Sequence, residues 1–120
     1  MYKADIDLPE ELRIPQPSGF RILVAVPEID DKSKGGVFLP DQLKTLEQTA
    51  SIFGFVIKLG PDAYKDQTKF PTGPWCKEGD FVLFRSYSGT RFKIDKHEFR
   101  LINDDTVEAV VDDPRIVARA

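Results

Sequence analysis

The sequence predicts an all-β fold, a small barrel built from short strands. Three observations support this prediction. Runs rich in β-branched and aromatic residues recur along the chain. Glycine, proline, asparagine and aspartate residues separate these runs, as expected for turns. No long segment shows convincing helical spacing of apolar residues. A chain of 120 residues is sufficient for one domain of this kind.

Two strands are expected in the first half of the chain. Residues 1–19 carry three prolines and a glycine, so we expect an N-terminal arm without long regular structure. Residues 20–26 form the first strand, which Pro27 ends. A long loop covers residues 28–50, and the second strand spans residues 51–59.

The sequence also predicts a distortion inside the second strand and a long excursion after it. Gly54 lies inside the second strand and predicts a bulge or a tight bend there. Residues 61–77 leave the barrel before the next strand. The aromatic residues Tyr64, Phe70 and Trp75 of this excursion are expected to cover one end of the barrel.

Four more strands are expected in the second half, at residues 81–84, 90–94, 98–102 and 107–111. The middle two alternate in polarity around Asp95, Lys96 and His97, which predicts a hairpin. The barrel domain therefore covers residues 20–111, and residues 112–120 form a C-terminal tail.

Composition excludes several classes of protein. The net charge of −3 does not favour nucleic acid as the main partner. One cysteine allows no internal disulfide, which suits a cytoplasmic protein. No apolar run approaches the ~20 residues that a membrane span needs, and the N-terminus lacks the apolar core of a signal peptide. We expect a cytoplasmic protein without a membrane partner.

An apolar triplet in the long loop is the most informative feature. Val37, Phe38 and Leu39 follow the pair Gly35-Gly36 inside an otherwise charged segment. Exposed apolar residues are unfavourable in water, so the triplet either folds back as a short core strand or binds a partner. The polar flanks give little reason for local order, and this favours a partner.

Several residue pairs suggest chemistry but have simpler explanations. Cys76 and His97 could act as nucleophile and base, although nothing in the sequence brings them together. Asp104 and Asp105 could bind a metal or transfer protons, but a solvated turn explains them better. The glycine pair in the loop lacks the lysine and helix start of a phosphate-binding loop.

Arg85, Tyr87, Arg91 and Phe92 place basic and aromatic residues on expected strands and turns, as nucleic-acid-binding barrels do. A β-barrel that binds nucleic acid or peptide through its loop is therefore the second hypothesis. An enzyme with Cys76 as nucleophile is the third. The acidic composition weakens the nucleic-acid version.

The order of motifs resembles the GroES-type co-chaperonins. The segments that carry the resemblance are residues 21–24 with the loop 32–40, Gly54–Gly60, Glu78–Phe84, Tyr87–Asp95 and the closing strand 104–111. Together they cover residues 20–111, in the family's order and at nearly its spacing.

The resemblance implies a GroES-like barrel with a mobile loop and a roof hairpin. It implies a homo-oligomer, a ring of seven subunits, that caps a GroEL-type chaperonin carrying ATP or ADP. The cap encloses non-native polypeptide and assists its folding. Such a lid has no catalytic residues, metal or cofactor, because the ATPase belongs to the partner.

The resemblance also assigns roles to individual residues. Gly35, Gly36, Val37, Phe38 and Leu39 would bind the chaperonin, and Tyr87 would face the chamber. The expected subunit interface joins the N-terminal strand of one subunit to the C-terminal strand of its neighbour, through Phe20, Arg21, Ile22, Val107, Ala109, Val110 and Val111.

This chain departs from the family pattern at several points. Phe38 is bulkier than the small aliphatic residues usual there, and the loop, the N-terminal arm and the C-terminal tail are longer. A longer loop suits a bulky client. Such divergence would fit a phage-encoded lid for capsid protein, acting in the host cytoplasm.

Overall fold

The computed structural model describes residues 13–26 and 52–117, and this part of the chain is all-β, which confirms the predicted fold class. Two 3-10 turns, η1 (Asp104–Thr106) and η2 (Pro114–Ile116), follow the last two strands. No helix within the described ranges is long and apolar enough to cross a membrane. The strands are β1 (Arg21–Ala25), β2 (Phe53–Leu59), β3 (Phe81–Leu83), β4 (Thr90–Ile94), β5 (His97–Asn103) and β6 (Ala109–Val111).

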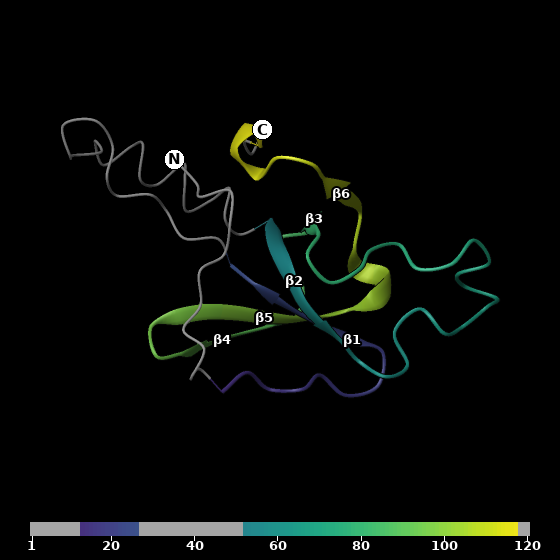
Figure 1. Cartoon of the computed structure of the whole chain (residues 1–120), viewed down its shortest axis with the longest axis horizontal. Helices are drawn as coiled ribbons and strands as arrows, with labels where there is room; N and C mark the ends of the chain where they lie inside the picture. The colour runs from purple at the N-terminus through teal and green to yellow at the C-terminus, as the bar shows by residue number, and fades with distance from the viewer. Residues whose placement is uncertain (1–12, 27–51, 118–120) are drawn as a thin grey trace.

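The strands form one antiparallel sheet in the order β4-β5-β1-β2-β3-β6. The sheet twists and curls, so that β6 lies across from the β4–β5 hairpin (Figure 1). Strand β1 lies in the middle, paired with β2 on one side and β5 on the other. Strands β4 and β6 are the two edges of the sheet.

Alternation along β1 explains how the sheet buries both faces. Ile22 and Val24 pack into the main cluster, which draws residues from β2, β3 and β5. Leu23 and Ala25 point to the other face and pack with Phe99. Because successive strand residues face opposite sides, an unbroken apolar strand is buried on both. This is why β1 can occupy the centre of the sheet.

Strand β2 contains a bulge, but not at the expected position. Leu23 pairs with Lys58 and Val24 with Val56, so Ile57 is the extra residue. At Gly54 we expected a bulge or a tight bend, and the register shows no extra residue there. A Cβ atom there would lie 2.9 Å from Cγ2 of Val24, so glycine is needed for close packing of two strands.

The expected hairpin is present with a tighter turn. Asp95 and Lys96 have φ angles of 48° and 74°, the left-handed conformation that a two-residue hairpin turn requires. Ile94 pairs with His97 across this turn. We expected His97 in the turn, but it is the first residue of β5.

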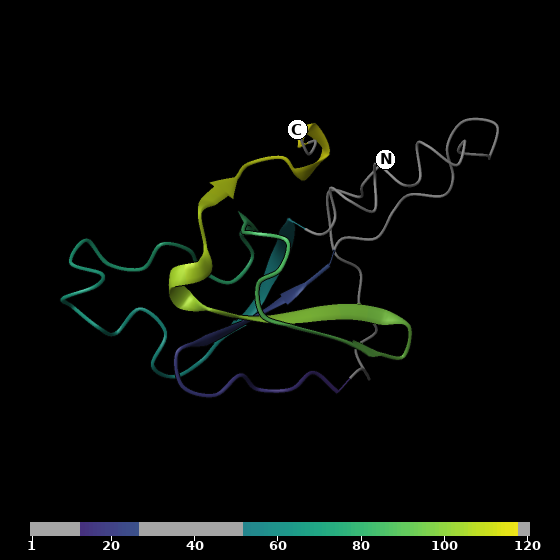
Figure 2. The ribbon, with the colours of Figure 1, turned by 180° about the vertical axis from the view of Figure 1, so that it is seen from behind.

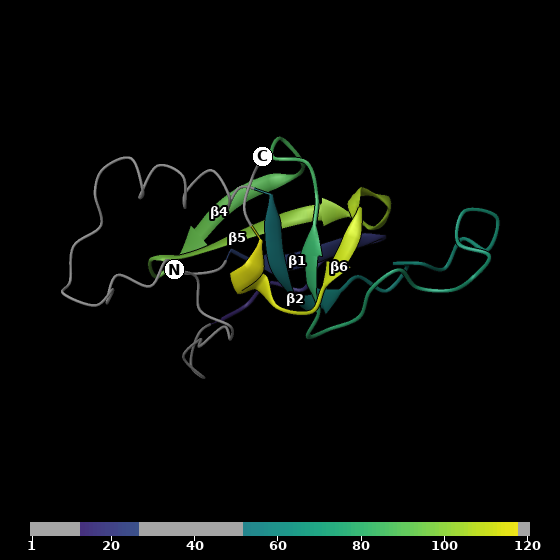
Figure 3. The same ribbon diagram turned by 90° about the horizontal axis from the view of Figure 1, so that it is seen from above.

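The excursion between β2 and β3 projects from the barrel and returns (Figures 1 and 3). Residues 60–80 contain turns but no strand, so the expected roof hairpin lacks a regular strand pair. Pro71 and Pro74 lie in this segment, and proline cannot donate a hydrogen bond to a strand ladder.

Aromatic packing anchors the excursion to the barrel. Tyr64 and Phe70 are buried in the main cluster, with ring centroids 4.8 Å apart in an edge-to-face arrangement. The expected aromatic cover is thus confirmed for these two residues. Trp75 packs edge-to-face on Phe70 at 4.8 Å but remains 41% exposed.

The described part of the C-terminal tail packs against the barrel. Pro114 is buried, and Val117 contacts an apolar cluster that includes Val26 and Ile52. The carboxylate of Asp113 accepts a hydrogen bond from the backbone N–H of Arg115 and starts η2. Residues 112–117 therefore pack with the folded domain, beyond the boundary that we expected at residue 111.

Candidate functional site

The loop residues Gly35, Gly36, Val37, Phe38 and Leu39 lie outside the described residues. The structure describes the two positions from which their segment departs. Val26 follows β1 and Ile52 precedes β2, and both pack with Phe53 and Phe81. Since β1 and β2 are antiparallel neighbours, the long segment begins and ends at adjacent strand ends. The residues on both sides of the long segment are therefore packed in the barrel.

Strand β6 provides an open edge. It pairs with β3 on one side, and no described strand pairs with its other side. Val110 is 46% exposed and Ala109 is also exposed. An unpaired, apolar edge strand tends to recruit another strand. Val107, just before β6, is instead buried in the core, and Val111 packs partly against a second apolar cluster.

Strand β1 has less surface available for contact with another subunit than the sequence suggested. Ile22 is fully buried in the protomer's own core, and its backbone pairs with Leu59 and Ile102 on the two sides. Neither its side chain nor an edge of β1 is open to another subunit. Phe20 is 47% exposed, and the guanidinium of Arg21 lies 5.7 Å from its ring centroid. These two side chains are available for contact.

Tyr87 is 94% exposed, the highest value among the large apolar and aromatic residues described. It lies in a turn that a hydrogen bond from Ser88 N–H to the Arg85 carbonyl closes at 3.0 Å. A ring with this exposure makes almost no stabilising contact within the protomer. Its role as a chamber-facing residue stays a prediction.

The basic and aromatic residues that suggested nucleic-acid binding have partners within the protomer. The Arg91 Nε atom donates to the Glu98 carboxylate at 2.9 Å, and Arg85 lies 3.8 Å from the Glu108 carboxylate. Phe92 stacks on Phe99. Carboxylates therefore accompany both arginines, which weakens the attraction for phosphate groups.

Cys76 and His97 are not brought together. Cys76 lies in the excursion, whereas His97 begins β5 beside the β4–β5 turn, and these segments lie at opposite ends of the molecule (Figures 1 and 2). The Cys76 Sγ atom lies 3.3 Å from the Tyr64 hydroxyl. Burial raises the pKa of the Cys76 thiol, so it stays protonated near neutral pH and is a poor nucleophile.

The two aspartates of η1 have structural partners. Asp104 is buried, and its Oδ2 atom accepts a hydrogen bond from the Tyr64 N–H at 3.0 Å. The expectation of a solvated turn is therefore wrong for Asp104. Asp105 pairs with the Lys69 ammonium at 2.8 Å. Across residues 13–26 and 52–117, no group of three or more His, Cys, Asp or Glu side chains is placed to hold a metal.

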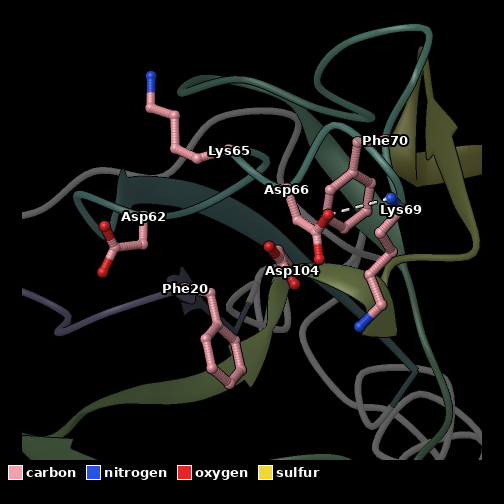
Figure 4. Close-up of a pocket in the computed structure, with 7 residues that line it drawn as sticks. All are labelled: Phe20, Asp62, Lys65, Asp66, Lys69, Phe70 and Asp104. Atoms are coloured by element: carbon pink, nitrogen blue, oxygen red, sulfur yellow. Dashed lines mark hydrogen bonds between the residues drawn. The ribbon is translucent and has the colours of Figure 1, made fainter.

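A hollow of about 410 Å³ lies beside these aspartates (Figure 4). The Asp66 Oδ1 atom accepts hydrogen bonds from the N–H groups of Thr68 and Lys69, at 3.0 and 3.3 Å. Asp104 accepts the hydrogen bond from Tyr64 described above. Two of the carboxylates that line the hollow, those of Asp66 and Asp104, therefore stabilise the local fold. The lining residues are Phe20, Asp62, Lys65, Asp66, Lys69, Phe70 and Asp104.

A second hollow was not expected from the sequence. It measures about 380 Å³ and lies between Trp75 and residues 107–109, beside the open edge of β6. The sequence carried one usable signal, a tryptophan in a polar, proline-rich excursion. The contact between that excursion and β6 joins segments more than thirty residues apart, and local patterns do not contain it.

Comparison with known proteins identifies close similarity to one family. Residues 15–111 match the family model described as the chaperonin 10 Kd subunit. A protein named co-chaperonin GroES from Caldicellulosiruptor saccharolyticus is 37% identical over 98 residues, which are 82% of this chain and 97% of that protein. A GroES from Clostridium botulinum is 33% identical over 97 residues, 81% of this chain and 97% of the relative. A GroES from Methylacidiphilum infernorum is 35% identical over 98 residues, 81% of this chain and 93% of the relative.

Proposed function

The chain belongs to the chaperonin 10 kDa family, and on that premise we propose that it is the co-chaperonin of a GroEL-type chaperonin. It caps the chaperonin in its ATP- or ADP-bound state and encloses non-native polypeptide, whose folding it assists. The observation that carries this proposal is the family match over residues 15–111, which covers every strand of the sheet. The protein itself is not an enzyme in this role and acts in the cytoplasm.

The loop triplet supplies the contact with the chaperonin. Burial of Val37, Phe38 and Leu39 would contribute roughly 1.5–3 kcal/mol each. Ordering a loop costs roughly 1–2 kcal/mol per residue, so a single loop binds weakly. Several loops on one ring act together, and avidity raises binding by about 10²–10⁴. The lid therefore holds firmly yet releases when the chaperonin's sites rearrange.

The ring, with seven subunits as the family resemblance implies, forms through β6. A head-to-tail ring needs two different complementary surfaces on each subunit. The open edge of β6, with Ala109 and Val110, supports one of them, and the exposed Phe20 and Arg21 support the other. Pairing in the ring would also protect this edge from aggregation. Tyr87 faces the chamber in this arrangement.

Substitution of one loop residue tests the proposal. Phe38→Asp should leave the ring intact and abolish binding to a GroEL-type chaperonin with ADP, because a charge replaces an apolar anchor in every loop. Gln42→Asp is the control, since it adds the same charge to the same segment outside the triplet. Native mass spectrometry reports both the ring and the complex.

Two results would contradict this account of the loop. If Phe38→Asp and Gln42→Asp bind the chaperonin equally well, the triplet is not the contact. If Phe38→Asp unfolds the protein, as judged by circular dichroism, the triplet belongs to the core.

A further inference from the structure

Trp75 has an unusual setting for an exposed residue. Its ring packs edge-to-face on Phe70 at 4.8 Å and lies 6.2 Å from the ring of Tyr64, and both of these residues are buried. The indole is therefore held in place from beneath, while 41% of the residue remains exposed. A rigid, exposed tryptophan loses little conformational entropy on binding, and such residues are enriched among those that dominate protein interfaces.

Three of the four described residues that line the hollow beside Trp75 are apolar. Val107 and Ala109 line it together with the indole, and Glu108 is the one charged residue among the described residues that line it. The Glu108 carboxylate lies 3.8 Å from Arg85, at an exposed position. The hollow measures about 380 Å³ and opens to solvent next to β6. A wall of tryptophan, valine and alanine suits an apolar side chain from another protein chain.

We propose that this hollow receives a side chain of a neighbouring copy of this chain, with Trp75 as the apolar anchor of the contact. The inference rests on the proposed ring and names a residue of its interface outside the paired strands. Val107 and Glu108 lead into β6, which begins at Ala109 and whose outer edge no described strand occupies. A strand from a second copy that pairs along this edge must pass beside the hollow, and alternate side chains would point toward it.

The same chain carries a suitable counterpart surface. Phe20 is 47% exposed and Arg21 lies against its ring, which gives an apolar group with a positive charge beside it. The hollow offers an apolar wall with the negative charge of Glu108. A head-to-tail contact joins two different patches of the same chain, and these two match in apolar character, while the exposed Glu108 carboxylate is shared with Arg85.

Trp75 is the sole tryptophan of the chain, so its fluorescence reports this hollow directly. The full chain is diluted through its assembly range, and native mass spectrometry measures the oligomeric state of the same samples. We expect emission at shorter wavelength and weaker quenching by acrylamide in the assembled form than in the dissociated form. Val110→Asp, placed at the open edge, supplies a dissociated reference if dilution alone does not.

A pair of substitutions tests the energetic role. Trp75→Glu should weaken assembly by about tenfold or more, whereas Trp75→Phe should retain most of it. Thr72→Glu is the control, because it introduces the same charge at an exposed position three residues away. Circular dichroism confirms that each variant is folded.

The outcomes separate this inference from the proposed function. A ring that caps the chaperonin while Trp75 is quenched equally in assembled and dissociated protein overturns the inference alone. A change in Trp75 emission only on addition of unfolded client protein also overturns it, in favour of a client contact. A chain that stays monomeric and ignores the chaperonin overturns the proposed function as well.

Discussion

Gly89 gives the sharpest test of how the barrel is packed. It precedes β4 and has a φ angle of +74°. A Cβ atom at this position would lie 2.0 Å from the carbonyl oxygen of Leu101 in β5 and 2.9 Å from Cγ2 of Ile102. Ordinary van der Waals contact begins at 3.4 Å, so Gly89→Ala requires a backbone shift of about 1.4 Å or an equivalent change in β5.

Gly79 provides a matched control for the backbone conformation. Its φ angle is +94°, but no heavy atom lies within 4 Å of the position that a Cβ atom would take there. Gly79→Ala should therefore lower the free energy of unfolding only by the left-handed penalty, about 1–2 kcal/mol. Gly89→Ala adds the steric conflict, typically about 1–3 kcal/mol more, and should lose about 2–5 kcal/mol.

Urea unfolding followed by circular dichroism measures both variants. The protomer concentration must be the same in each experiment, because assembly stabilises the folded state by mass action. Equal losses for Gly79→Ala and Gly89→Ala would refute the reasoning, since they would show that the Leu101 carbonyl does not constrain position 89.

Two further predictions concern buried polar groups. Asp104→Ala should lower the free energy of unfolding by about 1–3 kcal/mol, because the buried Tyr64 N–H loses its acceptor. Asp104→Asn, which keeps an acceptor oxygen, should lose less in the same urea experiment, and equal losses would contradict the role of this hydrogen bond. Burial is the main cause that raises the pKa values of both Tyr64 and Cys76 above their ordinary values of 10.0 and 9.0. Both groups therefore ionise more readily in the unfolded chain, so their contribution to stability should be constant below about pH 9 and fall at higher pH. Urea titrations of the double variant Tyr64→Phe with Cys76→Ser should show a flatter alkaline slope, and an unchanged slope would assign the loss to other groups.

Strand positions could be predicted from the sequence because their signals are local. Runs of β-branched residues and turn residues marked all six strands, and alternation marked the β4–β5 hairpin. The bulge was misplaced because Gly54 and Ile57 are both compatible with a distorted strand. Only the register between β1 and β2 shows that Ile57 is the extra residue.

The parts of the site that depend on tertiary contacts could not be predicted. Ile22 looked like an interface residue, but its place in the centre of the sheet follows from pairing with β2 and β5. Asp104 looked solvated because its acceptor role requires Tyr64, forty residues earlier.

Native mass spectrometry of the chain, alone and mixed with a GroEL-type chaperonin and ADP, shows whether the protein is a co-chaperonin. We predict a ring, of seven subunits, that adds to the chaperonin as one unit. A chain that remains monomeric and does not associate with the chaperonin would contradict it.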